Sequence, residues 1–195
     1  MEEPYYWIID NPHLSTLGND FELRLEIAKR LHIKDPKQLN FVRTHLGKPY
    51  LSDYQDAIDF SISRSRECSA IAIYEFGFCG IDLVHVDETF SEETFDLFLN
   101  RDEKIQLFES SQPNMLAFKY WTAKEAVGKC LGMGWQFPPQ MVRLQHIYSD
   151  RTKFYITSEA TGDLIWKSIV TKSGEALVCC AWLYPVQEPG VNSRG

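Results

Sequence analysis

The sequence predicts an α+β fold in two comparable halves. Apolar residues at alternating spacings of three and four mark a long helix from about Met115 to Trp135. Runs with strand-like alternation lie on both sides of this helix, and a second helical pattern lies near the N-terminus. Because no long linker separates the halves, we expect residues 1–90 and 91–195 to pack face to face. Clefts between such halves are common sites for small ligands.

The first half is predicted to contain one helix among several strands. The helix follows Asp20, which can cap it, and its apolar residues from Phe21 to Leu31 fall on one face. Asn11-Pro12 and Asp35-Pro36 interrupt the chain on either side. Strands are predicted at Tyr5–Asp10, Asn40–Thr44, Phe60–Ser65, Ser69–Glu75 and Phe78–Val86.

The second half is predicted to begin with helices and to end in strands. Ser91 can cap a helix over 92–99, and Asp102 can start a short helix over 103–108. Gly132 and Gly134 are expected to end the main helix. Strands are predicted at Met141–Ile147, Lys153–Thr157, Leu164–Thr171 and Ala176–Leu183, with a hairpin turn at 172–175. The polar tail from Gln187 onward is expected to fray.

Composition limits the functional classes. A chain of 195 residues that is 44% hydrophobic can bury a sizeable core. A net charge of −7 without clustered Lys and Arg argues against nucleic acid as a partner. The longest apolar run, 176–184, is too short to span a membrane. The acidic N-terminus lacks signal-peptide features, and the five cysteines suggest neither disulfides nor a zinc site, so we expect a cytoplasmic protein.

The main helix carries large side chains on both of its sides. Phe118, Trp121, Glu125 and Lys129 lie close together opposite the core-facing stripe, since residues three or four apart are helix neighbours. Glu125 is therefore expected to lie partly out of water, where an ionised carboxylate needs a cation. That cation is either Lys129, one turn on, or a metal ion. From this helix alone the ordinary helix pair is favoured over a metal-binding or catalytic role.

A second acid is predicted on an apolar strand face. In the strand Phe78–Val86, alternation places Asp82 on the same side as Val84 and Val86. Aspartate is depleted in strands, and on an apolar face it needs a partner. Asp82 is thus the candidate partner of Glu125. His85 faces the other way and alone is more typical of a structural residue.

Two stretches of the first half offer cations. Lys48 stands between a glycine and Pro49 on a fairly rigid loop. The strand Phe60–Ser65 places Ser63 beside Arg64, and hydroxyl and guanidinium groups together suit a phosphate. An ordinary turn and a solvated surface strand are the simpler interpretations of these two stretches.

Three motifs occur in order along the chain, GKPY with FSISRS, then GIDLV, then WTAKEAVGK. Over about 46–135 they resemble the 4′-phosphopantetheinyl transferases of the larger, pseudo-dimeric (Sfp-type) class. The resemblance implies two similar α+β halves with the active site at their interface, usually in a monomer. It also implies Mg²⁺-dependent (Mn²⁺ is possible) transfer of phosphopantetheine from coenzyme A to a serine of an apo acyl or peptidyl carrier protein. Adenosine 3′,5′-bisphosphate is the product that leaves.

The resemblance assigns roles to individual residues. Asp82 and Glu125 match the metal ligands, and Lys129 matches a lysine that binds the phosphate of coenzyme A. Glu103 falls where the family has a glutamate proposed to deprotonate the serine. Ser63 and Arg64 match residues that bind the 3′-phosphate of coenzyme A, and Lys48 and Pro49 match the adenine-side loop. Lys124 matches a lysine beside the pyrophosphate, and Trp121 matches a tryptophan that positions this part of the helix.

The chain departs from the family pattern in three places. Val84 stands where a third acidic ligand is frequent, so a water molecule must complete the metal shell. Arg64 replaces the usual histidine and keeps a cation there. The N-terminal region is shorter than in many relatives, and Arg24 or Arg43 is the candidate substitute for its basic residues. The competing hypotheses are a non-catalytic homologue that binds coenzyme A or a carrier protein, and an unrelated α+β interaction protein.

Overall fold

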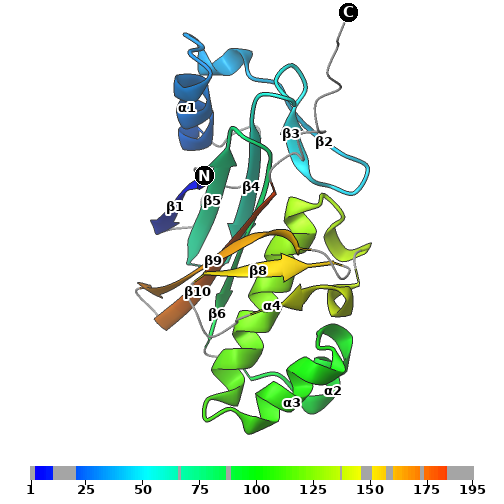
Figure 1. The fold of residues 1–195 in the computed structure, drawn as a ribbon. Coiled ribbons are helices and arrows are strands. Elements are labelled where there is room, and N and C mark those ends of the chain that lie inside the picture. The colour runs from blue at the N-terminus through cyan, green and yellow to red at the C-terminus, as the bar shows by residue number, and fades with distance from the viewer. Residues whose placement is uncertain are drawn as a thin grey trace, which may run out of the picture.

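The computed structural model describes residues 3–10, 21–65, 67–86, 89–136, 138–145, 151–156, 160–171 and 174–183. Its mixture of helices and antiparallel sheets confirms the predicted α+β class (Figure 1). Helix α1 (Phe21–Arg30) lies at one end of the molecule, and helices α2 (Glu92–Phe98) and α3 (Arg101–Glu109) lie at the other. No helix in this described part of the chain is long and apolar enough to cross a membrane.

A three-stranded sheet packs against α1. Its strands have the order β1-β5-β4, with β1 at Tyr5–Asp10, β5 at Cys68–Tyr74 and β4 at Asp59–Arg64. Buried residues of α1, β4 and β5 form one apolar cluster, so α1 covers one face of this sheet. A short 3₁₀ helix, η2 (Pro36–Gln38), then leads to the hairpin of β2 (Phe41–Arg43) and β3 (Pro49–Leu51).

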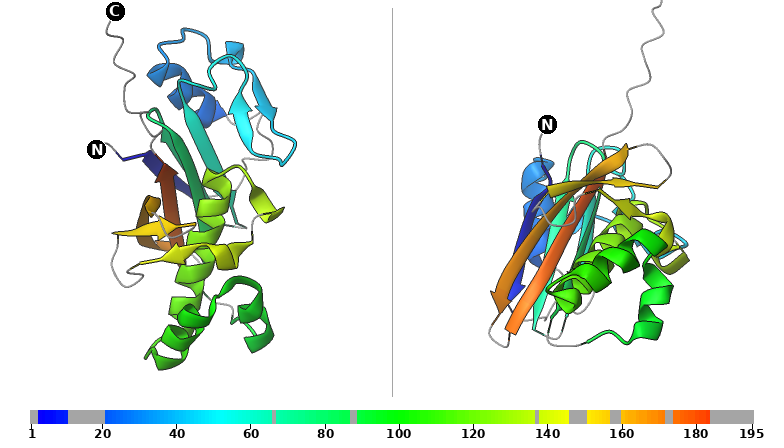
Figure 2. Two further views of the ribbon diagram at one scale, coloured as in Figure 1. Left: turned by 45° about the vertical axis from the view of Figure 1, so that its right-hand side comes forward. Right: turned by 60° about the horizontal axis from the view of Figure 1, so that its bottom comes forward.

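A five-stranded sheet packs against the long helix α4 (Pro113–Cys130). Helix α4 covers one face of this sheet, and α2 and α3 lie beyond it (Figure 2). The other face packs against the first sheet through a second apolar cluster. The layers therefore run helix, sheet, sheet, helix. The strands, in sheet order, are β6 (Phe78–His85), β10 (Gly174–Leu183), β9 (Ala160–Thr171), β8 (Arg151–Tyr155) and β7 (Arg143–Leu144).

Strand β6 precedes residue 90, yet it is hydrogen bonded in the second sheet. The division into 1–90 and 91–195 stays a prediction.

Strand β6 approaches α4 closely because residue 80 is glycine. A Cβ at Gly80 would lie 2.0 Å from the carbonyl oxygen of Ala126 and 2.3 Å from the backbone nitrogen of Cys130. Any larger residue would push β6 away from α4.

The two sheets are joined at their edges by a side-chain ladder between β4 and β6. Both strands are edge strands, and polar side chains of β4 accept hydrogen bonds from backbone N–H groups of β6. Each pair is separated by 20 residues in sequence, so the ladder follows the two-residue period of both strands. Its bonds are Cys79 N–H to Asp59 Oδ2 at 2.7 Å, Ile81 N–H to Ser61 Oγ at 3.0 Å and Leu83 N–H to Ser63 Oγ at 3.2 Å.

Several predicted boundaries need correction. Helix α3 begins at Arg101 because Asn100, not Asp102, caps it through a reciprocal bond pair with Glu103. Ser91 occupies the N-cap of α2, but its hydroxyl bonds to the Thr94 hydroxyl instead of the helix backbone. Of the strand expected at 141–147, the described residues 141–145 form only β7, because residue 141 belongs to the 3₁₀ helix η4 (Pro139–Met141). A further 3₁₀ turn, η3, follows α4 at 134–136. The expected cap at residue 20, part of the turn at 172–175 and the tail lie outside the described residues.

Candidate active site

Asp82 and Lys129 form an ion pair between β6 and α4. Lys129 Nζ lies 2.7 Å from Asp82 Oδ1 and also donates to Ser63 Oγ at 3.0 Å and to the Ile81 carbonyl at 3.1 Å. Asp82 is only 7% exposed. Ser63 Oγ donates to the same Oδ1 at 2.9 Å. Within the described ranges no group donates a hydrogen bond to Oδ2, so one oxygen of this carboxylate remains available.

Glu125 lies one turn before Lys129 on α4 and is half-buried, as the sequence predicted. Burial raises the pKa of the Glu125 carboxyl, the negative charge of Asp82 raises it further, and Lys129 lowers it. The two carboxylates are therefore close enough to repel each other. No hydrogen bond or ion pair to the Glu125 carboxylate occurs among the described residues. The sequence offered Lys129 as the cation for Glu125, but its ammonium group instead contacts Asp82.

This arrangement of oxygens fits a divalent cation. Asp82 Oδ2 and the Glu125 carboxylate come from opposite sides of the β6–α4 interface, and neither accepts a hydrogen bond from a described residue. Mg²⁺ prefers oxygen ligands and commonly binds through one or two carboxylates while keeping several waters. In the described part of the chain, no group of three or more His, Cys, Asp and Glu side chains could hold a metal ion. Half-buried Val84 packs against the apolar cluster beside α4 and offers no ligand.

Glu103 and Lys124 form a second, deeper ion pair between α3 and α4. Lys124 Nζ donates to Glu103 Oε2 at 2.6 Å and to the Phe98 carbonyl at 2.7 Å, and the two side chains are 1% and 4% exposed. Asn100 N–H also donates to Glu103 Oε2, while Oε1 is buried without a hydrogen bond from any described residue. Burial raises the pKa of Glu103 and lowers the pKa of Lys124, and in each case the partner's charge opposes the shift.

A basic pocket of about 200 Å³ lies beside the first ion pair. Arg43 and Lys129 supply positive charge to it, and Lys48 forms part of its wall. The Lys48 ammonium group binds Asp59 Oδ2 at 2.6 Å and the carbonyls of Cys79 and Cys130. The pocket is lined by Arg43, Leu46, Gly47, Lys48, Pro49, Ser61, Ile62, Lys129, Gly132 and Gly134.

The structure brings some of the predicted site residues together and separates others. Asp82, Glu125, Lys129 and Ser63 surround one point of the β6–α4 interface. Lys48 and Pro49 line the adjacent pocket. Exposed Arg64 ends β4. The other three lie in the helical layer, Glu103 and Lys124 as a buried pair and Trp121 against the rings of Phe90 and Phe98.

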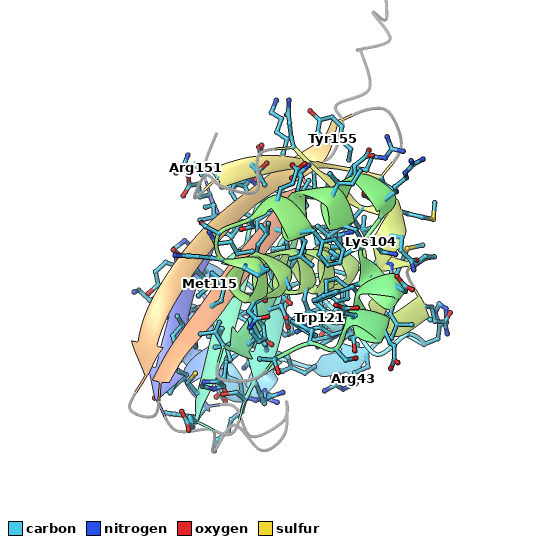
Figure 3. The ribbon with its side chains drawn as sticks, turned by 90° about the horizontal axis from the view of Figure 1, so that it is seen from below. Arg43, Lys104, Met115, Trp121, Arg151 and Tyr155 are labelled. Atoms are coloured by element: carbon cyan, nitrogen blue, oxygen red, sulfur yellow. The ribbon has the colours of Figure 1, made fainter. Side chains whose placement is uncertain are left out.

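Figure 3 views the molecule from below and shows Trp121 among the side chains that fill the helical layer. The tryptophan ring centroid lies 5.3 Å from that of Phe98, the last residue of α2. Phe98 also provides the carbonyl that accepts from Lys124. Trp121 thus helps to hold α2 against α4, next to the buried ion pair.

Sequence analysis missed the contribution of Asp59 and gave Arg43 no supporting motif. The two-residue alternation of a strand could have identified Asp59. It lies two residues before Ser61, so it shares the polar side of β4 with Ser61 and Ser63. Of the two candidate arginines, Arg43 lines the pocket. Arg24 instead stacks over the Phe41 ring and donates to nearby carbonyls.

A family model described as the 4′-phosphopantetheinyl transferase superfamily matches residues 78–181. The matched region contains Asp82, Glu103 and all of α4, whereas the residues that the β2–β4 region contributes to the pocket precede it.

The chain is also similar to the 4′-phosphopantetheinyl transferase HetI of Nostoc sp., with 31% identity over 105 residues. That match covers 51% of this chain and 44% of HetI, so the chain spans less than half the length of this relative. Among solved structures, it resembles the holo-acyl-carrier-protein synthase (AcpS) of Thermotoga maritima, with 14% identity and a TM-score of 0.43. This alignment covers 54% of the chain and 63% of the synthase.

Proposed function

The chain belongs to the 4′-phosphopantetheinyl transferase superfamily, and we propose that it transfers phosphopantetheine from coenzyme A to a serine of an apo acyl or peptidyl carrier protein. Adenosine 3′,5′-bisphosphate is the other product. The observation that carries the proposal is the pairing of Asp82 with half-buried Glu125 beside a pocket that contains Arg43 and Lys129. Such a site can hold a polyanionic nucleotide and a divalent cation together.

Coenzyme A is proposed to bind in the basic pocket. Lys129 would contact its pyrophosphate, because the ammonium group already lies between the pocket and Asp82. Arg43 on the pocket wall and exposed Arg64 on β4 are the proposed partners of the 3′-phosphate, since guanidinium groups bind phosphate oxygens bidentately. The loop at Gly47 and Pro49 is proposed to contact the adenine.

Asp82 and Glu125 are the proposed ligands of the Mg²⁺ ion. When bound, the ion would supply positive charge that stabilises the negative charge developing during transfer. Glu103 is the proposed base that takes the proton of the carrier serine. Its Oε1 accepts no hydrogen bond from the described residues, and Lys124 fixes the other oxygen. The serine oxygen then forms a bond to phosphorus, and the bond to the adenosine bisphosphate breaks.

The proposal is tested by mass spectrometry of the carrier. The chain is incubated with an apo carrier protein, coenzyme A and Mg²⁺, and the intact carrier mass is measured. We expect the carrier to gain one phosphopantetheine group with the wild-type chain and none when EDTA removes the metal. Asp96→Asn is a matched control, because Asp96 is an exposed acid that pairs only with Lys104 among the described ion pairs. It should transfer at the wild-type rate.

A binding-only homologue is the alternative, and Val84 in place of a third acid is the observation that favours it. In that case coenzyme A would bind, but no carrier from fatty-acid, polyketide or peptide synthesis would gain mass. A monomer acting in the cytoplasm is proposed for either function. All five cysteines are buried and free, which suits a reducing compartment.

A further inference from the structure

We propose that Ser63 is a positioning residue that orients Asp82 and Lys129 for the cation and the phosphates, instead of binding the 3′-phosphate. This inference rests on the proposed function, because it concerns the same site. It reassigns a residue that the sequence motif placed at the 3′-phosphate.

The hydrogen-bonding capacity of the Ser63 hydroxyl is fully used within the protein. A serine hydroxyl has one donor and two acceptor positions. Here it donates to Asp82 Oδ1 at 2.9 Å and accepts from Leu83 N–H at 3.2 Å and from Lys129 Nζ at 3.0 Å. Ser63 is 6% exposed. It has no hydrogen bond left to offer a phosphate oxygen.

These three bonds determine which oxygen of Asp82 a cation can reach. Ser63 and Lys129 both bind Oδ1, so the carboxylate is held with Oδ2 free of donors from the described residues. The Leu83 bond fixes the hydroxyl itself, because it ties Ser63 to the backbone of the strand that carries Asp82. Without the hydroxyl, the carboxylate can rotate, and Lys129 can bind both of its oxygens.

Arg64, the neighbour of Ser63 on β4, can bind the 3′-phosphate without help from the Ser63 hydroxyl. Successive side chains of a strand point to opposite sides, so Arg64 and Ser63 diverge from β4. Arg64 is exposed whereas Ser63 is buried. A phosphate that meets the guanidinium group therefore approaches the other side of the strand.

Three variants test the role of Ser63. Ser63→Ala removes the hydroxyl, and Ser63→Thr keeps it. Ser65→Ala, one residue past the end of β4, removes a hydroxyl that bonds to His85 and to the backbone N–H groups of residues 67 and 68. The affinity for Mn²⁺, measured from the loss of the electron paramagnetic resonance signal of the free ion, should fall by about 10–100-fold in Ser63→Ala. Ser63→Thr should restore most of the affinity, and Ser65→Ala should match the wild type.

A second measurement separates positioning from phosphate binding. In Ser63→Ala, kcat/KM should fall by the same factor with coenzyme A and with 3′-dephospho-coenzyme A. A fall confined to coenzyme A, or Mn²⁺ affinity unchanged in Ser63→Ala, would overturn the inference even if the wild-type chain modifies its carrier. Conversely, a wild-type chain that modifies no carrier would refute the proposed function. The Mn²⁺ affinities of the wild type, Ser63→Ala and Ser63→Thr would still test the positioning role of Ser63. Should Ser63→Ala fail to fold, Mn²⁺ binding by Ser63→Thr as weak as that of Asp82→Asn would count against the proposal.

Discussion

Replacement of Lys124 by methionine should destabilise the fold by about 3–5 kcal/mol, because it leaves a buried carboxylate without its cation. Lys124 Nζ and Glu103 Oε2 are 2.6 Å apart, and their side chains are 1% and 4% exposed. Methionine replaces most of the lysine stem, so packing changes little. Among the described residues, Glu103 then keeps the hydrogen bond from Asn100 N–H and the weaker influence of the Arg143 charge. A domain of this kind has about 5–15 kcal/mol of stability, so the loss is a large fraction of it.

Urea unfolding at pH 7 measures this loss, and the double variant Glu103→Gln/Lys124→Met provides the control. Glutamine is uncharged and can still accept from Asn100, so the double variant should be more stable than the single one.

The stability of the single variant should also depend on pH. Burial raises the pKa of Glu103 in the folded state, and without Lys124 it rises further. A group of this kind stabilises the fold at low pH and loses that contribution as the pH rises through its folded pKa. The single variant should therefore recover stability as the pH falls toward 4.5, the ordinary pKa of a glutamate carboxyl. If Lys124→Met lowers the free energy of unfolding by less than about 1 kcal/mol, or if the double variant is less stable than the single one, the reasoning about the buried ion pair is wrong.

Three further predictions concern the β6–α4 interface. Glu125→Gln should be more stable than the wild type at pH 7 and equal to it near pH 4, because the raised folded pKa of Glu125 costs stability as the pH rises. Urea midpoints at both pH values would check this. A variant less stable than the wild type at pH 7 would contradict it. Asp82→Asn should abolish the rise in Tm that Mg²⁺ gives the wild type and slow transfer at least about 100-fold; an undiminished Tm rise would exclude Asp82 as a ligand. Gly80→Ala should cost about 2 kcal/mol or more, since its Cβ would meet Ala126 O at 2.0 Å; thermal unfolding unchanged from the wild type would show that β6 and α4 are farther apart.

The parts of the structure that depend on local pattern could be predicted from the sequence. The spacing of apolar residues predicted α4, and alternation correctly placed Asp82 with Val84 on the side of β6 that faces it. Both signals arise from the periods of a helix and a strand, which need no knowledge of distant residues. The half-buried position of Glu125 followed from the same reasoning.

The choice of partners within the site could not be predicted in this way. Lys129 is one helical turn from Glu125 but binds Asp82, which is 47 residues away. This choice depends on how closely β6 approaches α4, and that approach is set by the missing side chain of Gly80. Lys48 similarly appeared to be a solvated loop residue, whereas its ammonium group is enclosed by Asp59 and two carbonyls. Neither contact leaves a periodic signal in the sequence.

The side-chain ladder has a consequence for how the chain avoids self-association. A sheet border with open backbone donors is a template on which a foreign strand can add, and it promotes aggregation. Here β4 shields the border of β6, since side-chain oxygens of β4 accept from the outward N–H groups of Cys79, Ile81 and Leu83. A fragment that lacked β4 would present those donors to any extended peptide. Such a fragment should therefore self-associate more readily than the intact chain.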